Sequence, residues 1–447
     1  MGNVYIALHV DTEGPLYESR EELFFRVKEI FGIDLEPTDE NLFLLQNKKL
    51  NLGGMEEEVA QVTDPHVIGF KGSWEQIDLM LDNILSPKYR NAMTDSAGGG
   101  WVYNWHIMDQ VGYRHNPRRR DLGFFNVLDF YLSKLKATGS TQDGVHWHFH
   151  PVNFFGDANR CATSYTNSYP LLNEIISRRL IERGLFPRVN RAGFHSERPD
   201  GHWFLEQWIP FDPSNQSVLE DQAPKHQRDM RAGRFGDWRL APSDWSLYHP
   251  HHDHYQLPGH CRRVIARVLN LKARHRSINS LEIKKAFEKA RAGENVYLGL
   301  TNHDWREMAA EIDEFRALLA PVAVEYSDVP FFFSESVEAF QAILFPEVNC
   351  ADQALRFSAK IEKSSPPRLV VEVEQGQCFG PQPWLAILSK GRNYYHDNFD
   401  LGELGRSFVY VFDGHTLELD EVQKLSVACN DKYGNQWVCH LEAGKDF

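Results

Sequence analysis

The feature that most constrains the fold is the alternation, over residues 1–345, of short β-rich runs with amphipathic stretches. The expected strands are 4–10, 101–108, 144–150, 188–194, 295–301 and 321–327, and the expected helices are 20–32, 74–85, 122–139, 169–184 and 280–293. Several helical stretches end in Gly, which readily adopts the left-handed conformation of a helix end. Strands that alternate with helices form βα units, and such units build a mainly parallel sheet.

The number of these units favours a closed or nearly closed (β/α) barrel over an open, doubly wound sheet. The first strand is not followed by the Gly-x-Gly-x-x-Gly motif of dinucleotide-binding folds, which argues further against the open sheet. We therefore expect a (β/α) barrel over residues 1–345.

The pattern changes after residue 345. From residue 352 to 447, short apolar runs are separated by Pro, Gly, Asn and Asp, without intervening helical stretches. Regularly spaced short strands are typical of a β-sandwich. The sequence NDKYGN, residues 430–435, is expected to form the turn between the last two strands. We predict a second, all-β domain over residues 352–447.

Composition excludes several classes of protein. The chain has 447 residues, of which 42% are hydrophobic and 13% aromatic, enough for a full globular core rather than a disordered chain. The net charge of -14 argues against a nucleic-acid-binding protein, which usually carries a basic stripe. The one strongly basic run is RHNPRRRD, residues 114–121. We interpret it as a solvated loop, with contact to an acidic sugar or a phosphate as the alternative.

The start of the sequence and its cysteines indicate a cytoplasmic location. The first predicted strand begins at once, without the basic stretch and the apolar run of a secretory signal. No apolar run approaches the length of about 20 residues that a membrane-spanning helix needs. The six cysteines form no Cys-x-x-Cys pair, a usage that suits free thiols in a reducing compartment.

Two carboxylates follow the first predicted strand, in VYIALHVDTEGP, residues 4–15. Side chains alternate along a strand, so His9, Asp11 and Glu13 would share a face if the strand runs that far. Two carboxylates at such a strand end can divide the work, one binding a metal and the other acting as a general base. The alternative is a helix N-cap formed by Asp11 or Thr12.

Three histidines alternate along a later strand, in DGVHWHFHPV, residues 143–152. His146, His148 and His150 lie on one face of an extended strand. One buried histidine is usually a hydrogen-bonded core residue, but three in alternation favour metal ligation. Imidazole together with carboxylate suits zinc and, less exclusively, iron, cobalt or nickel.

Two further histidine sites carry weaker signals. In LGLTNHDWRE, residues 298–307, a β-rich run ends in His303 and Asp304, which could also be a surface pair or a helix start. The cluster YHPHHDHY, residues 248–255, lies in an irregular region. We interpret this cluster as a solvated loop or lid, with a second metal site as the alternative, because no strand would fix its ligands.

The order of these motifs resembles the polysaccharide deacetylases of the NodB-homology carbohydrate esterase family. The resemblance extends over roughly residues 1–340 and includes an Asp-x-Glu strand end, a multi-histidine strand end, an arginine at another strand end and a late histidine. It implies an incomplete (β/α) barrel of about seven strands and a divalent metal held by one carboxylate and two histidines. In the family pattern the second acid directly follows the first and is an aspartate, whereas here Thr12 intervenes and the second acid is Glu13.

The resemblance also implies a role for each residue. Asp11 matches the catalytic base, Arg191 the arginine that orients this base, and His303 the general acid. Glu13 takes the place of the metal-binding aspartate. His146 and His150 have the usual i, i+4 spacing of the metal ligands, whereas the variant His-x-His-Pro motif would pair His148 with His150. FDPSN, residues 211–215, resembles a segment that lines the substrate groove.

We therefore expect a metal-dependent hydrolase, with zinc as the favoured metal, that removes an N-acyl group from a sugar or glycan precursor. The alternatives are a metallohydrolase of a non-sugar or cyclic amide on the same barrel, and a binding or assembly module without catalysis. The C-terminal β-domain is expected to bind substrate or a protein partner. The long insertion of residues 32–100 suggests a specialised substrate or partner surface.

Overall fold

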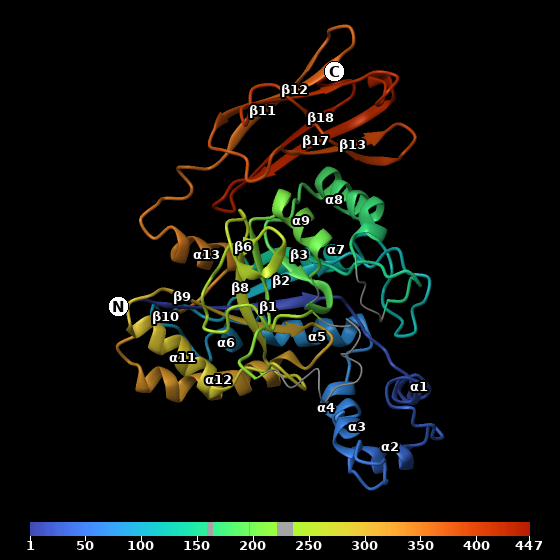
Figure 1. Ribbon diagram of the computed structural model, residues 1–447, viewed down its shortest axis with the longest axis vertical. Helices are drawn as coiled ribbons and strands as arrows, with labels where there is room; N and C mark the ends of the chain where they lie inside the picture. The colour runs from blue at the N-terminus through green and yellow to red at the C-terminus, as the bar shows by residue number, and fades with distance from the viewer. Residues whose placement is uncertain (159–163, 196, 221–235) are drawn as a thin grey trace.

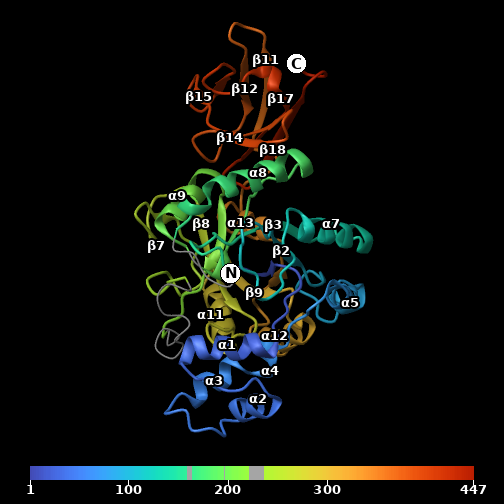
Figure 2. The same ribbon diagram turned by 90° about the vertical axis from the view of Figure 1, so that its right-hand side faces the viewer.

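The computed structural model describes residues 1–158, 164–195, 197–220 and 236–447. Figure 1 shows three regions along the long axis of the molecule: a β-sandwich at one end, a barrel in the middle and a small group of helices at the other end. The view turned by 90° shows the same order (Figure 2). No helix among the described residues is both long enough and apolar enough to cross a membrane.

Seven parallel strands form the barrel. They are β1 (Val4–Thr12), β2 (Tyr103–Met108), β3 (Gly144–Phe149), β4 (Asn190–Ala192), β5 (Phe211–Asn215), β8 (Val264–Asn270) and β9 (Val296–His303), in the spatial order β4-β3-β2-β1-β9-β8-β5. A single bridge between Val189 and Phe211 links the two ends of this order, so the barrel is nearly closed. A short strand, β10 (Phe331–Phe333), pairs with the first residues of β1. The predicted incomplete seven-stranded barrel is confirmed.

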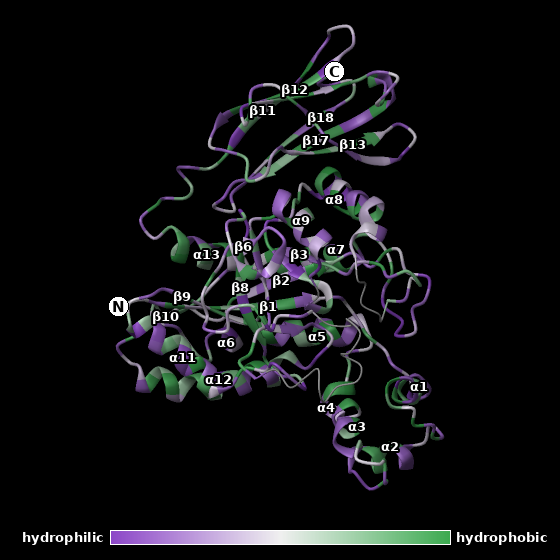
Figure 3. Cartoon of the chain, in the orientation of Figure 1, coloured by the Kyte–Doolittle hydropathy of each residue, from purple (hydrophilic) through white to green (hydrophobic). Residues whose placement is uncertain are grey.

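Helices cover the outside of the barrel. They are α5 (Trp74–Ile84), α6 (Pro87–Arg90), α7 (Asn126–Thr138), α8 (Tyr169–Arg183), α9 (Pro199–Trp208), α11 (Ser280–Arg291), α12 (Met308–Glu325) and α13 (Ser336–Leu344). Hydrophobic and hydrophilic residues alternate along α11 and α12 in Figure 3, as expected for helices with one face on a core. Gly139 and Gly184 end α7 and α8 in the left-handed conformation, as the sequence predicts.

One predicted strand is wrong, and two of the seven barrel strands are absent from the prediction. Residues 321–327 overlap the end of helix α12, because Phe315, Leu319 and Val322 are buried at helical spacing, whereas Val324 is 78% exposed. Burial of that helical face outweighs the strand preference of the β-branched residues. The barrel strands that the sequence-based prediction lacks are β5 and β8.

The helix before the long insertion and the first part of the insertion form a separate helical cap. Its helices are α1 (Arg20–Phe31), α2 (Asp39–Gln46), α3 (Glu56–Val62) and α4 (Pro65–Ile68). Their apolar residues pack into a small core of their own, built around Phe24, Val27 and Phe31 from α1 and Val59 and Val62 from α3. The cap is therefore stabilised internally and projects from the barrel at the end away from the sandwich (Figure 1).

The C-terminal region is a sandwich of two antiparallel sheets, as predicted. One sheet contains β11 (Arg356–Glu362), β12 (Arg368–Gln375), β16 (Ser407–Val411) and β15 (Asp400–Leu401). The other contains β14 (Tyr394–Asp397), β13 (Trp384–Ser389), β17 (Val422–Asn430) and β18 (Gln436–Glu442). Residues 431–435 form the turn of the antiparallel β17–β18 hairpin, as the sequence predicts.

The sandwich packs on the barrel through helices α8 and α9. Trp384 of β13 lies in the same hydrophobic cluster as Ile176 of α8 and Trp208 of α9. The cluster also contains Trp147 and Phe149 of β3, so the core extends from the barrel wall into the sandwich. The five cysteines in the described residues are free thiols.

Candidate metal centre and active site

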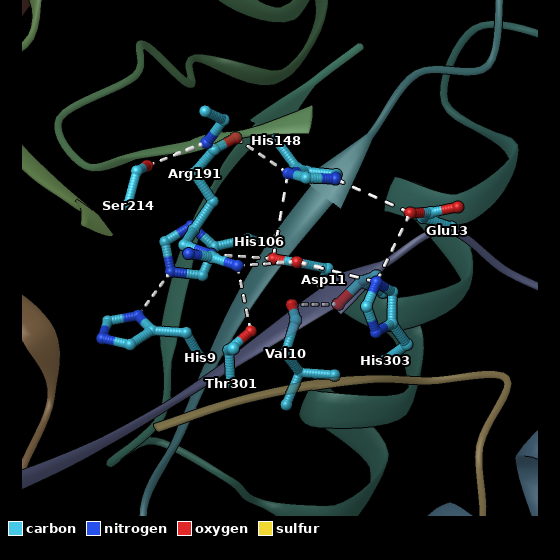
Figure 4. A network of polar contacts seen from close by, with 12 residues as sticks. His9, Val10, Asp11, Glu13, His106, His148, Arg191, Ser214, Thr301 and His303 are labelled. Carbon is cyan, nitrogen blue, oxygen red and sulfur yellow. Dashed lines mark hydrogen bonds and ion pairs between the residues drawn. The ribbon is translucent and has the colours of Figure 1, made fainter. Parts of the chain in front are cut away.

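The carboxyl ends of neighbouring barrel strands gather the predicted site residues. Asp11 lies near the end of β1, His148 near the end of β3, Arg191 in the middle of β4 and His303 at the end of β9. Because these strands are parallel and close in the sheet order, their ends meet at one face of the barrel. Figure 4 shows Asp11 between Arg191, His148 and His303, with Glu13 on the far side of His148 and His303.

Three buried side chains could hold a metal ion. Glu13, His148 and His150 each offer one ligand atom, and these atoms lie within 4.8 Å of one another. Glu13 Oε1 is 3.7 Å from His148 Nε2 and 3.4 Å from His150 Nε2, and the two nitrogens are 2.8 Å apart. Within the described part of the chain, no other three such residues are grouped this way.

The chemistry of this donor set fits a divalent ion. The Nδ1–H of His148 donates to the carbonyl of Arg191 at 2.8 Å, which leaves the lone pair of Nε2 for a metal. A backbone carbonyl that orients a ligating histidine in this way is common around metal sites. Two imidazoles and one carboxylate also form the three-ligand set of catalytic zinc sites, in which one position stays open for water or substrate. The divalent metal that the sequence predicts is thus compatible with the site.

His146 lies apart from these three residues. Its Nε2 is 2.7 Å from Glu335 Oε1 and 3.3 Å from Asn104 Oδ1, inside the barrel. Inward-facing residues two positions apart are separated by about 7 Å along a strand, so His146 occupies the layer below His148. Of the two histidine pairs that the sequence leaves open, the structure brings together His148 and His150.

Two other histidines, His9 and His106, lie in the polar interior of the barrel below the site. His9 Nδ1 lies 2.8 Å from His106 Nε2, and His9 Nε2 lies 2.9 Å from the hydroxyl of Tyr297 (Figure 4 shows both histidine rings). Burial holds the pKa of both histidines well below the usual value, so both rings are neutral at pH 7. These residues fill the barrel with hydrogen-bonded neutral groups.

Arg191 holds the predicted catalytic base. Its Nε donates to Asp11 Oδ1 at 3.0 Å and its Nη2 to Asp11 Oδ2 at 2.9 Å. The guanidinium also donates to the carbonyl of Pro213 at 2.8 Å and to the hydroxyl of Thr301 at 3.0 Å. Burial alone would raise the pKa of Asp11, but the charge and hydrogen bonds of Arg191 hold it well below its usual value. Asp11 is therefore a carboxylate at neutral pH.

His303 lies on the other side of Asp11. Its Nε2 is 3.8 Å from Asp11 Oδ2 and 4.0 Å from Glu13 Oε1, and its ring packs on that of Trp305 at a centroid distance of 4.5 Å. Desolvation lowers the pKa of His303 to about 4, although the two carboxylates raise it. The imidazole is therefore neutral at pH 7, whereas the sequence-based role of general acid requires that it first gain a proton.

Two residues that support Glu13 were not assigned from the sequence. Asp304 accepts hydrogen bonds from the backbone N–H groups of Glu13 at 3.1 Å and Gly14 at 2.8 Å, and from the Tyr131 hydroxyl at 3.1 Å. Burial raises the pKa of Asp304 to about 7. Arg120 Nη1 contacts Glu13 Oε2 directly. In the sequence, Asp304 could have been recognised by its position next to His303. Arg120 could have been recognised by its place in the basic run.

The basic run, residues 114–121, is only in part the solvated loop that the sequence predicts. Arg114 and Arg119 are exposed, but Arg120 is buried, and Arg118 and Arg120 both line the cavity above Asp11. The segment 211–215 also differs from expectation, because it does not line this cavity and instead supports Arg191 through Pro213. The 248–255 region forms a short hairpin of β6 (Pro250–His251) and β7 (His254–Pro258), and its residues are not among the candidate metal ligands.

The cavity has a volume of about 270 Å³. Its floor contains Asp11, His148 and His303, and Ile30, Val62 and Val67 of the helical cap contribute an apolar wall. The insertion thus reaches the candidate site. No protein-family model, curated protein or solved structure matches this chain. The resemblance to polysaccharide deacetylases accordingly stays a prediction from the sequence motifs.

Proposed function

We propose that this protein is a metal-dependent hydrolase that removes an N-acyl group, with acetyl as the simplest case, from a sugar or glycan precursor. The observation that carries the proposal is the position of Asp11 and His303. Their Oδ2 and Nε2 atoms are 3.8 Å apart, and His303 Nε2 is also 4.0 Å from Glu13 Oε1 of the candidate metal centre. A base and a proton carrier beside a three-ligand metal site are the parts that amide hydrolysis needs.

Glu13, His148 and His150 would hold the ion, and zinc is the metal that we propose. When bound, the ion supplies Lewis acidity, which acidifies water and polarises the acyl oxygen. Arg191 keeps Asp11 ionised and fixes its orientation, because both carboxylate oxygens accept hydrogen bonds from the guanidinium.

The proton would pass through Asp11 and His303. Asp11 takes a proton from the attacking water as the new C–O bond forms. The pKa of His303 is about 4 and that of Asp11 is held lower by Arg191, so the proton is more stable on the imidazole. His303 then donates it to the nitrogen of the leaving amine as the C–N bond breaks. The products are a carboxylic acid and an amine, and the protons balance.

A second candidate is hydrolysis of a non-sugar or cyclic amide by the same residues. The observation that favours it is the apolar wall formed by Ile30, Val62 and Val67, because a sugar ring presents mostly hydroxyl groups. A non-catalytic binding module is less well supported, because binding alone would not require the Asp11–Arg191 pair and His303 beside the candidate metal ligands.

The test is amide hydrolysis by the full-length protein. Release of acetate and of free amine would be measured on a panel of N-acetylated monosaccharides, N-acetylated amino acids and cyclic amides. We expect activity on at least one of these substrates, its loss after chelation and its recovery with zinc. A protein that binds zinc but hydrolyses no member of the panel would contradict the proposed function.

A further inference from the structure

The wall of the cavity above the candidate metal ligands is rich in arginine. Arg26, Arg118, Arg120, Arg274 and Arg306 all line it, and Asp11 and Glu13 are the carboxylates among the lining residues. Arg26 comes from the helical cap, whereas Arg118 and Arg120 come from the loop after β2 and Arg306 from the loop after β9. Arg274 follows β8, so arginines from four separate segments converge on one cavity of about 270 Å³.

The carboxylates that contact Arg26, Arg118 and Arg120 only partly neutralise them. Arg26 donates two hydrogen bonds of 2.9 Å to Glu18, and Arg118 donates to the same carboxylate at 3.2 Å. One negative charge is therefore shared by two positive charges. Arg120 contacts Glu13, the carboxylate that a divalent ion would also bind. A bound ion would further increase the positive charge of the cavity.

Buried hydrogen-bond donors on the same wall lack partners. In the described portion of the chain, Arg306 Nη2, Trp305 Nε1 and Arg120 Nε are buried and form no hydrogen bond. Arg306 is 8% exposed, and its Nε donates to Glu311 at 2.7 Å. Leaving one buried donor without an acceptor costs about 1–3 kcal/mol, so these three donors add unmet hydrogen-bonding capacity to the arginine-rich wall.

We propose that the cavity contains a subsite for an oxyanion, a carboxylate or a phosphate, on the substrate. The Arg118 and Arg306 guanidinium groups bind it, and the Trp305 indole N–H provides a further donor. Guanidinium groups suit oxyanions because their N–H groups match two oxygens at once. This inference rests on the proposed function for its reaction, and it adds that the N-acylated substrate is a small, negatively charged molecule.

The helical cap supports the small size of this substrate. Ile30 of α1, Val62 of α3 and Val67 of α4 form part of the cavity wall opposite the barrel strands. The cavity of about 270 Å³ lies just below the range of about 300–1,000 Å³ for drug-sized ligands, so it suits a compact molecule. A long neutral polymer would require an open groove at this position.

The first experiment measures anion binding without reference to catalysis. Inorganic phosphate and, separately, acetate would be titrated calorimetrically into the full-length protein, before and after EDTA treatment, so that binding to a metal is separated from binding to the arginines. We expect phosphate or acetate to bind in both states, and the tighter of the two identifies the preferred oxyanion.

The variants are Arg118→Gln, Arg306→Gln and Trp305→Phe. Arg119→Gln is the matched control, because Arg119 is an exposed neighbour in the same loop whose guanidinium lies over the ring of Tyr17 at 4.4 Å. Loss of one charge-assisted donor is expected to weaken anion binding about 10-fold or more, whereas the control should bind like the wild type. If Arg306→Gln does not fold, Arg118→Gln and Trp305→Phe decide the question.

The second experiment compares hydrolysis of N-acetylglucosamine with that of its 6-phosphate, its 1-phosphate and N-acetylmuramic acid. We expect kcat/KM to be higher for at least one anionic substrate and this preference to fall in Arg118→Gln. Equal rates on neutral and anionic sugars, or anion binding that is the same in Arg118→Gln and Arg119→Gln, would overturn the subsite and leave the proposed hydrolase intact. Anion binding that depends on Arg118, without hydrolysis of any substrate, would support the subsite and contradict the hydrolase.

Discussion

Arg191 and Asp11 form a buried ion pair with two parallel hydrogen bonds, of 3.0 and 2.9 Å, and neither side chain is more than 2% exposed. The pair joins β4 to β1 across the end of the barrel. A guanidinium that donates to both oxygens of a carboxylate fixes its orientation. Arg191 therefore keeps Asp11 ionised and holds it in a fixed position beside the candidate metal ligands. The proposed mechanism depends on this geometry.

Replacement of Asp11 tests its role as base. In Asp11→Asn, we expect kcat to fall by about 100-fold or more, the usual contribution of a positioned general base, while metal content stays at the wild-type value because Asp11 is not one of the three ligands. Turnover and elemental analysis on the same preparation would measure both.

The variant leaves the buried Arg191 without its negative partner, so thermal unfolding must accompany the assay. Wild-type turnover in a folded Asp11→Asn protein would show that another group accepts the proton. Joint loss of metal and turnover would instead assign Asp11 to the metal.

His146 provides the complementary test. We expect His146→Ala to retain metal, because its imidazole contacts Glu335 and Asn104 rather than the three ligands. The variant should lower the free energy of unfolding by about 2 kcal/mol, because it removes a buried imidazole and its contacts with Asn104 and Glu335 and leaves a cavity. Denaturant unfolding and metal analysis would measure the two effects. Loss of metal in a stably folded His146→Ala protein would show that this residue is also a ligand.

The junction between barrel and sandwich should respond to pH through His396. Its ring stacks on Trp384 at a centroid distance of 3.6 Å, and burial lowers its pKa to about 4. The unfolded chain, with a histidine pKa near 6.5, binds a proton first as the pH falls. Stability is therefore lost as the pH falls from about 6.5 to about 4, by at most about 3 kcal/mol, and the loss is complete below pH 4.

Comparison with His396→Phe isolates this contribution, because phenylalanine keeps the stacking and removes the titration. The difference in unfolding free energy between the two proteins should be constant above pH 7 and shift in favour of the variant between pH 6.5 and 4. His415→Gln, at an exposed position of the same domain, is the control and should follow the wild type. A difference for His396→Phe that does not change with pH would contradict the neutral, half-buried state of His396.

The barrel could be predicted where the sequence pattern matches local structure. Helices α5, α8 and α11 carry apolar residues at helical spacing and follow the predicted bounds closely. Strand β5 could not be recognised, because its residues Phe-Asp-Pro-Ser-Asn are mostly polar yet fully buried. Asp212 and Ser214 are satisfied there by contacts with Arg263, just before β8, and with the backbone N–H of Ala192 in β4, which are not apparent from local sequence.

The candidate site, like the barrel, could be predicted only in part from the sequence. Asp11, His148, His150 and His303 are visible because reactive residues stand at or near the ends of apolar runs, and parallel strands bring such ends together. Sequence spacing alone left open which two histidines pair, since that depends on the layers of the barrel. The contact of Arg120 with Glu13 spans 107 positions, and only the folded chain shows it.

The central claim is that Glu13, His148 and His150 bind a divalent ion, and metal analysis tests it most directly. Purified wild-type protein would be stripped with chelator, reloaded with zinc, freed of excess metal and examined by elemental analysis beside His148→Ala and His150→Ala. We expect about one zinc per wild-type chain. Removal of a hydrogen-bond partner of a metal ligand typically lowers metal affinity by about 10–100-fold. Loss of a ligand itself, in either variant, should lower the affinity for zinc by more than that. Wild-type protein that takes up no metal, or variants that hold as much as the wild type, would contradict the account.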